Sequence, residues 1–174
     1  MRNWGLAETV LDLETGMVDT PILSLVQPKD AVGKQVRQNS SDLFLTRQLA
    51  EGVLPVARKA KCIFVEVPVG SQSARSMASY GFCIGVLGAV IAEGIPLIEV
   101  TALESKLAFS GKKDATKQDM IDAGLAQYPD ANWPMHNGAV SAAKAEHVAD
   151  ALGAIHAGVR TSVFQNLMRL FAKV

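Results

Sequence analysis

Cys62-Ile63-Phe64-Val65-Glu66-Val67-Pro68 is a continuous apolar run with a single charge inside it. A strand without alternating polar positions is typical of the centre of a covered, largely parallel sheet. The proline ends the strand, and α/β folds place their ligands at strand ends. Because a carboxylate in an apolar strand is unfavourable unless it is paired, hydrogen-bonded or metal-bound, Glu66 is a candidate site residue. A strand-end carboxylate that pairs with a lysine at the surface is the alternative interpretation.

The rest of the chain alternates between strand-like and helix-like patterns, which predicts an α/β layered domain. A turn at Glu14-Thr15-Gly16 joins the first two strands into a hairpin. Ser40 or Ser41 is the expected N-cap of the first helix. The expected strands cover 6–13, 21–26, 62–67 and 96–100, and the expected helices cover 40–59, 71–93, 116–128 and 139–173, the last broken near Gly158.

Composition predicts one globular domain over residues 1–174. The chain has 174 residues, 49% of them hydrophobic and 20% charged, and its formal net charge is zero. A surface that binds phosphate must therefore come from local clusters of lysine and arginine. Cys62 and Cys83 lack C-x-x-C spacing and are expected to be thiols of a cytoplasmic protein. The apolar stretch 81–92, about a dozen residues, is too short to span a bilayer and predicts a buried helix.

Two acidic residues and a histidine occupy one face of the expected last helix. His147 and Asp150 are three residues apart, and Glu146 is four residues from Asp150, so their side chains are neighbours. Such a face can supply ligands to Mg²⁺ or Mn²⁺, or a ligand and a general base. An exposed polar helix turn is the alternative, although the surrounding alanine, leucine and isoleucine residues favour packing.

A basic group follows the last expected strand. Its members are expected to contact DNA phosphate, and a solvated charge run diluted by nearby aspartates is the alternative. The set comprises Lys106, Lys112, Lys113, Lys117 and, on the helix after Glu66, Arg75. The chain contains no GxxxxGK[ST], GxGxxG or G-x-S-x-G motif, which argues against a nucleotide cofactor and against an α/β-hydrolase.

Four short stretches in this order resemble the RuvC-type Holliday-junction resolvases, nucleases of the ribonuclease H-like fold. The stretches are Asn3-Trp4-Gly5-Leu6-Ala7, Phe64-Val65-Glu66-Val67-Pro68, the lysine-rich residues 106–117, and His147-Val148-Ala149-Asp150-Ala151-Leu152. The resemblance implies a layered α/β/α domain with a mixed central sheet. It also implies two Mg²⁺ or Mn²⁺ ions held by Glu66, His147 and Asp150, DNA-backbone contacts from Lys106 and Lys117, and a homodimer formed through the 71–93 helix.

The chain departs from the family pattern in three places. The family's opening strand ends in a catalytic Asp just before the region that matches Asn3, whereas this chain starts at Met1. We interpret this as a start at an internal Met, which a longer reading frame would support and an upstream stop would contradict. Without that strand, a gap is expected between the strand of Leu6 and the strand of Glu66. Residues 69–72 lack the family's junction-wedging aromatic residue, and 159–174 form a C-terminal helical extension.

The resemblance implies a metal-dependent endonuclease that resolves branched DNA, such as Holliday junctions, as a homodimer. Cleavage is expected to be weak or absent because one catalytic Asp is missing. Two other functions stay open: a catalytically inactive ribonuclease H-like module that binds nucleic acid or a protein, and a purely structural dimerisation domain.

Overall fold

The structure is a computed structural model that describes residues 3–30 and 37–171. The chain divides into two compact units, which are described separately. The first unit comprises Met1–Trp4, Val26–Ile63 and Val67–Leu97, and the second comprises Gly5–Leu25, Phe64–Glu66 and Ile98–Val174. The prediction of one domain over 1–174 with an extension over 159–174 stays a prediction.

The described strands pair two by two. Strand β1 (Trp4–Glu8) pairs with β2 (Ile22–Val26), and β3 (Ile63–Glu66) pairs with β4 (Leu97–Val100). An antiparallel bridge between Leu11 and Val18 continues the predicted hairpin, whose turn contains Gly16 at φ 72°. Within residues 3–30 and 37–171, no hydrogen-bonded ladder joins the β1–β2 pair to the β3–β4 pair. The gap expected between the strands of Leu6 and Glu66 stays a prediction.

In the first unit, α1 (Gln38–Ala57) packs against α2 (Ala74–Ala92). The predicted N-cap at Ser40 or Ser41 is wrong, because the helix begins at Gln38 after Arg37, which makes no side-chain capping bond. Pro55 lies in the last turn, where its missing N–H removes one helical hydrogen bond, and the helix ends two residues later.

Helix α2 is 19 residues long, so the inference from 81–92 that this segment is too short to span a bilayer underestimated its length. By length and composition alone, α2 could cross a membrane. Core helices of water-soluble proteins meet the same two conditions, so this finding is weak support for a membrane span. The helix buries one face, formed by Ser79, Cys83, Val86, Leu87 and Val90. Cys62 is partly buried and Cys83 is buried on α2, and no disulfide joins the two cysteines.

The second unit contains four helices in its described part: α3 (Ala102–Ser110), α4 (Lys117–Gln127), α5 (Ala142–Gly158) and α6 (Ser162–Phe171). The predicted helix over 116–128 is confirmed as α4, capped by Thr116. Helix α3 was not predicted, although Thr101 and Glu104 form a capping box. The break near Gly158 is confirmed. The helix after residue 139 begins only at Ala142, because β5 (Met135–His136) and β6 (Ala139–Val140) first form a short hairpin.

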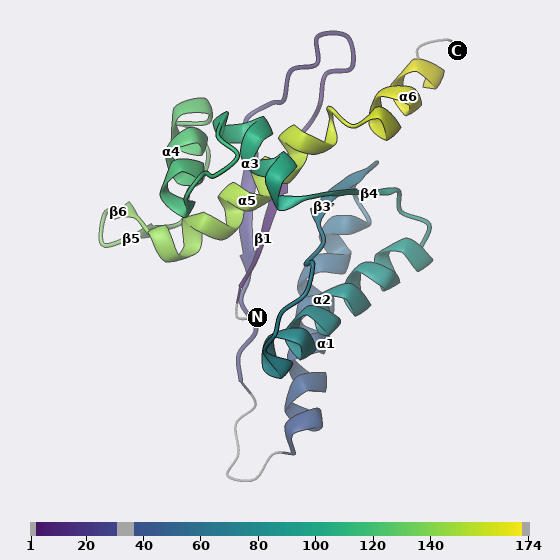
Figure 1. The fold of residues 1–174 in the computed structure, drawn as a ribbon, viewed down its shortest axis with the longest axis vertical. Helices are drawn as coiled ribbons and strands as arrows, with labels where there is room; N and C mark the ends of the chain where they lie inside the picture. Colours follow the sequence, from purple (N-terminus) through teal and green to yellow (C-terminus); the bar gives the residue numbers. More distant parts are fainter. Residues whose placement is uncertain (1–2, 31–36, 172–174) are drawn as a thin grey trace. The chain divides into compact units, whose positions relative to one another are not determined.

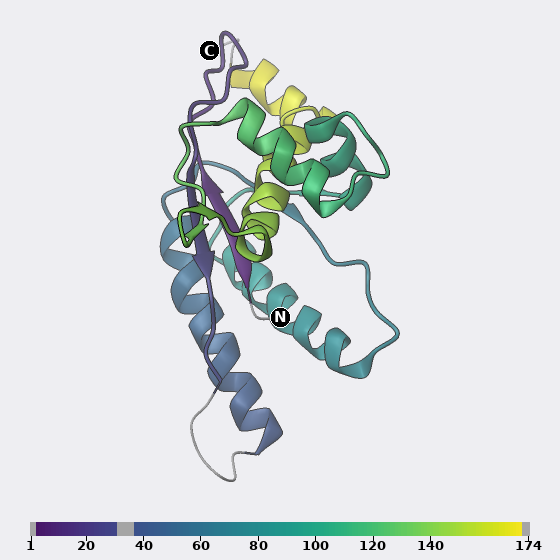
Figure 2. The same cartoon turned by 90° about the vertical axis from the view of Figure 1, so that its left-hand side faces the viewer.

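Helix α5 is the central element of the second unit, and nine of its 17 residues are buried. It packs against α3 and α4 and lies beside the β1–β2 hairpin (Figures 1 and 2). The approach of β1 requires Gly5, because a Cβ at that position would lie 1.9 Å from the carbonyl oxygen of His147. Gly158 meets the ring of Phe64 on β3 in the same way, at 1.9 Å. Two glycines therefore let β1 and β3 lie directly against α5.

Candidate functional site

Glu66 is the last residue of β3 and is exposed. Partial burial of its carboxyl group raises the pKa above its usual value, and the positive charge of Lys106 on α3 opposes that rise. The sequence-based alternative, a strand-end carboxylate facing a lysine, therefore describes part of its surroundings. Whether Glu66 only pairs with Lys106 at the surface or belongs to a functional site depends on a second carboxyl group nearby.

That second group is Asp150, which lies on α5 in the same unit. Desolvation, followed by the negative charges of Glu66 and Glu146, raises the pKa of Asp150 to about 6. The positive charges of Lys117 and Lys106 act in the opposite direction. Glu66 and Asp150, which are 84 residues apart in the sequence, are thus brought near enough to repel each other. Asp150 is exposed like Glu66, so water screens this repulsion and the shift does not translate directly into a loss of stability.

His147 joins the same face of α5, as its spacing from Asp150 predicts. Its side chain is 28% exposed, and its Nε2 lies 3.5 Å from Oε1 of Glu146. Burial lowers the pKa of His147, and the charge of Glu146 only partly offsets this effect. The ring is therefore mostly neutral at pH 7, and its approach to Glu146 is a polar contact rather than an ion pair. A neutral imidazole can bind a cation or accept a proton.

Glu146 is the residue that the sequence-based site omitted. Its carboxylate forms an ion pair with the ammonium group of Lys117, at the start of α4. The Glu146 side chain is 17% exposed, whereas that of Lys117 is 76% exposed. The signal was present in the sequence, since Glu146 lies four residues before Asp150. We call Glu66, Glu146 and Asp150 the acid cluster.

The predicted DNA-binding cations fall into two groups. Three of them are paired with acids: Lys117 with Glu146, Lys112 with Asp119 at 2.5 Å, and Arg75 with Asp42 at 2.8 Å. The Lys112 pairing, followed by hydrogen bonds from Thr116, holds the pKa of Asp119 well below its usual range. The other two are Lys106 and Lys113, which form no ion pair within the described ranges.

The five cations also differ in where they lie. Lys106 and Lys117 are close enough to the acid cluster to affect the pKa of Asp150. Arg75 belongs to the first unit, on α2, whereas the acid cluster belongs to the second unit. The structure thus brings together Glu66, His147, Asp150, Lys106 and Lys117 in one unit, and it adds Glu146 to them.

The acid cluster and His147 have the chemical groups of a divalent-cation site, but their side chains are not arranged closely enough to coordinate an ion. Carboxylate oxygens and an imidazole nitrogen suit Mg²⁺ or Mn²⁺, and a bound cation would relieve the repulsion that raises the pKa of Asp150. Within the described residues, however, no three Asp, Glu, His or Cys side chains converge closely enough to hold a metal ion. The donor set fits a cation, and cation binding would require these side chains to draw together.

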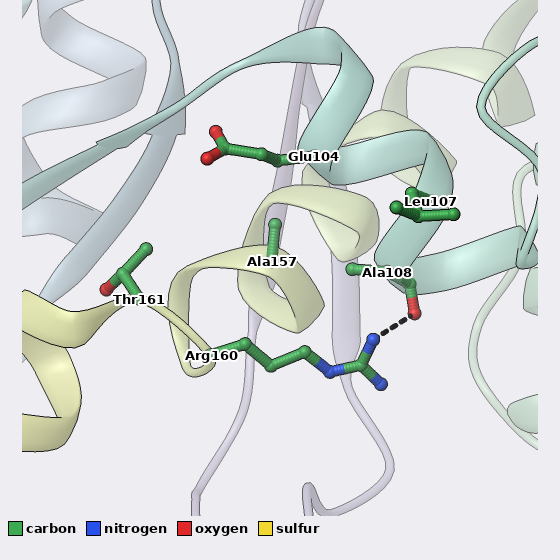
Figure 3. Close-up of a pocket in the computed structure, with 6 residues that line it drawn as sticks. All are labelled: Glu104, Leu107, Ala108, Ala157, Arg160 and Thr161. Carbon is green, nitrogen blue, oxygen red and sulfur yellow. Dashed lines mark hydrogen bonds between the residues drawn. The ribbon is translucent and has the colours of Figure 1, made fainter.

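A separate pocket of about 220 Å³ lies between α3 and the end of α5. Its floor is apolar, and Arg160 crosses it to donate a hydrogen bond of 2.9 Å to the carbonyl of Ala108 (Figure 3). The Glu104 carboxylate points in a different direction, and it is already engaged in the capping box with Thr101 (Figure 3). These two charged groups are thus occupied in helix capping and in joining α3 to α5, and the pocket does not include the acid cluster.

Among the solved structures whose fold is similar to this chain are two of one protein, with and without its substrate. Thermus thermophilus RuvC is 16% identical over 97% of this chain and 91% of that chain, with a TM-score of 0.58. T. thermophilus RuvC in complex with Holliday junction substrate is also 16% identical, over 95% of this chain and 88% of that chain, with a TM-score of 0.56. No protein-family model matches the chain, and no curated protein matches it by sequence. The chain therefore has a RuvC-like α/β fold of the ribonuclease H-like class, as the sequence predicts.

Proposed function

We propose that this protein is a cytoplasmic, divalent-metal-dependent endonuclease that acts on branched DNA, such as Holliday junctions, as a homodimer. The observation that carries the proposal is the acid cluster, in which Glu66 and Asp150 lie near each other with Lys106 and Lys117 beside them. Carboxylates that repel one another attract a cation, and the neighbouring lysines attract phosphate. The fold supports the same function, since a similar protein is described in complex with a Holliday junction substrate.

Glu66 and Asp150, with His147 as a further ligand, would hold Mg²⁺ or Mn²⁺ as a pair of ions. The metal would supply an activated water and neutralise charge on the phosphodiester. The chain's own residues do the rest. Lys106, which forms no ion pair in the described part of the chain, can contact a backbone phosphate and orient it. When it is not bound to a cation, the neutral ring of His147 can accept a proton at a nitrogen.

A homodimer would give two related active sites, which suits two symmetric nicks. The exposed face of α2 supports this part of the proposal. It forms an apolar stripe at helical spacing, made of Met77, Gly81, Ile84, Gly85, Gly88 and Ile91. A Cβ added at any of its three glycines would meet no atom of the described residues within 4 Å, so a second helix could approach the backbone closely.

The test is cleavage of a synthetic four-way junction in the presence of Mn²⁺. We expect weak nicking by the unmodified chain, and we expect Glu66→Gln to reduce this residual rate on the order of 10²–10³-fold, since a lost metal ligand removes several kcal/mol of transition-state stabilisation. The matched control is Glu99→Gln, because Glu99 is an exposed glutamate on the neighbouring strand β4. Equal rates for Glu66→Gln and Glu99→Gln would remove Glu66 from the site.

A catalytically inactive module that binds branched DNA is the second candidate. Two observations favour it: no three metal-binding side chains converge within the described residues, and three of the five predicted DNA-binding cations are already paired. It predicts junction binding that weakens with salt, together with no nicking at any Mn²⁺ concentration.

A further inference from the structure

The ion pair between Glu146 and Lys117 has unequal partners. The glutamate lies on α5, the most buried helix of the second unit, and its side chain is 17% exposed. The lysine is the first residue of α4, and its side chain is 76% exposed. The acid is therefore fixed by packing, whereas the lysine can swing into solvent.

The surroundings of this ion pair are those of the acid cluster. Glu146 contacts His147 and lies near Asp150, so it already faces another negative charge. Lys117 is the cation that offsets this charge directly. A DNA phosphate that approached the cluster would offer Lys117 the same kind of partner as Glu146, an anionic oxygen.

We propose that Glu146 competes with the DNA backbone phosphate for Lys117 and so limits the affinity of the free protein for DNA. The proposal rests on the proposed function, because it assumes that the acid cluster faces DNA. Glu146 is a positioning residue under this proposal: it holds Lys117 against α5 until a phosphate replaces it. Lys106, which forms no ion pair in the described part of the chain, would make the first phosphate contact.

The first experiment tests the ion pair without DNA. Trace acetylation of the intact chain in EDTA, followed by mass spectrometry, reports the reactivity of each lysine amine. We expect Glu146→Gln to increase the acetylation rate of Lys117 by about 2- to 5-fold, the range for an ion pair with one exposed partner. Lys113, which is exposed and forms no ion pair within the described ranges, is the internal reference. An unchanged rate at Lys117 would overturn the proposal.

The second experiment measures affinity for a four-way junction by fluorescence anisotropy in EDTA. We expect Glu146→Gln to bind about 3- to 10-fold more tightly, with a salt slope steeper by about 0.9 because one more phosphate is contacted. In a Lys117→Gln background, Glu146→Gln should give no gain, because its effect acts through Lys117. In a Lys113→Gln background, the gain should persist.

The outcomes separate the ion-pair proposal from the proposed function. If Glu146→Gln tightens binding equally with and without Lys117, it merely removes a repulsive charge, and the competition is overturned. If the junction binds but Glu146→Gln changes nothing, the competition is again overturned and the proposed function stands. If neither the unmodified chain nor any variant shows salt-sensitive binding, the proposed function fails, and the phosphate role of Lys117 fails with it.

Discussion

Helices α2 and α5 use glycine in opposite ways. On α5, a Cβ at Gly158 would lie 1.9 Å from the Phe64 ring, and one at Gly153 would lie 2.8 Å from Met120. On α2, a Cβ at Gly81, Gly85 or Gly88 would meet nothing within 4 Å in the part of the chain that the structure describes. Neighbouring side chains of the same unit pack directly against the α5 glycines. The α2 glycines lie on an exposed apolar face. Close packing around α5 thus holds the helix that carries the candidate site, whereas the exposed glycines of α2 leave room for a second helix at the candidate interface.

The largest expected effect comes from adding a methyl group where the backbone of α5 is closest. Gly5→Ala would place a Cβ 1.9 Å from the carbonyl oxygen of His147, and the backbone cannot move aside cheaply. We expect the free energy of unfolding to fall by about 3 kcal/mol or more. Denaturant titration of the intact chain measures it.

The matched control is the same substitution on α2. Gly85→Ala adds its methyl group in open space and should raise the free energy of unfolding by about 0.5–1 kcal/mol, because alanine favours a helix. Equal effects of Gly5→Ala and Gly85→Ala would contradict the comparison. A dimer that weakens in Gly85→Ala while the fold becomes more stable would support the apolar stripe as its interface.

The sequence predicted the fold best where local signals and packing agree. The helix expected over 116–128 is α4, and the break expected near Gly158 divides the last helix. The first helix was misplaced because its N-terminus has no side-chain cap, so the serines nearby gave a false signal. Helix α3 was not predicted, although Thr101 and Glu104 have the spacing of a capping box. The pairing of strands two by two depends on contacts between distant segments, and local patterns do not encode them.

The next effect is a dependence of stability on pH. The pKa of Asp150 is raised to about 6 in the folded chain, from its ordinary value of 3.8. Between these values the folded state binds more protons than the unfolded state, so the free energy of unfolding falls as pH rises through this window. We expect a fall of about 1 kcal/mol, discounted from the full shift because Asp150 is exposed. Urea titrations from pH 4 to 7 measure it, and an equal slope in Asp150→Asn would refute this origin.

The smallest expected change in stability comes from replacing two buried serines, one in each unit. Oγ of Ser105 on α3 is buried and has no hydrogen-bond partner among the described residues, whereas the Ser79 hydroxyl on α2 donates to the carbonyl of Arg75 at 3.1 Å. We expect Ser105→Ala to stabilise the chain by about 1 kcal/mol and Ser79→Ala to destabilise it by about 1 kcal/mol. Thermal unfolding of both variants checks the signs, and a loss of stability in Ser105→Ala would show that its hydroxyl has a partner in solution.

The sequence identified most residues of the candidate site, but it did not show which of their charges are paired with one another. Spacing on one helix linked His147 and Asp150, and the position of Glu66 in an apolar strand identified it. Which cations are already paired depends on tertiary contacts, so the pairing of Lys117 with Glu146 could not be predicted from charge counts. Glu146 was visible as a neighbour of Asp150, but its role became apparent only when α4 placed Lys117 against it.

The central claim is that the acid cluster on β3 and α5 binds a divalent cation. The most direct test is the affinity of the intact chain for Mn²⁺, measured from free Mn²⁺ by electron paramagnetic resonance. We predict binding by the unmodified chain and by Glu99→Gln, and binding at least about 10-fold weaker, or about 1.4 kcal/mol, in Glu66→Gln and in Asp150→Asn. Equal Mn²⁺ affinity in all four proteins would contradict the claim.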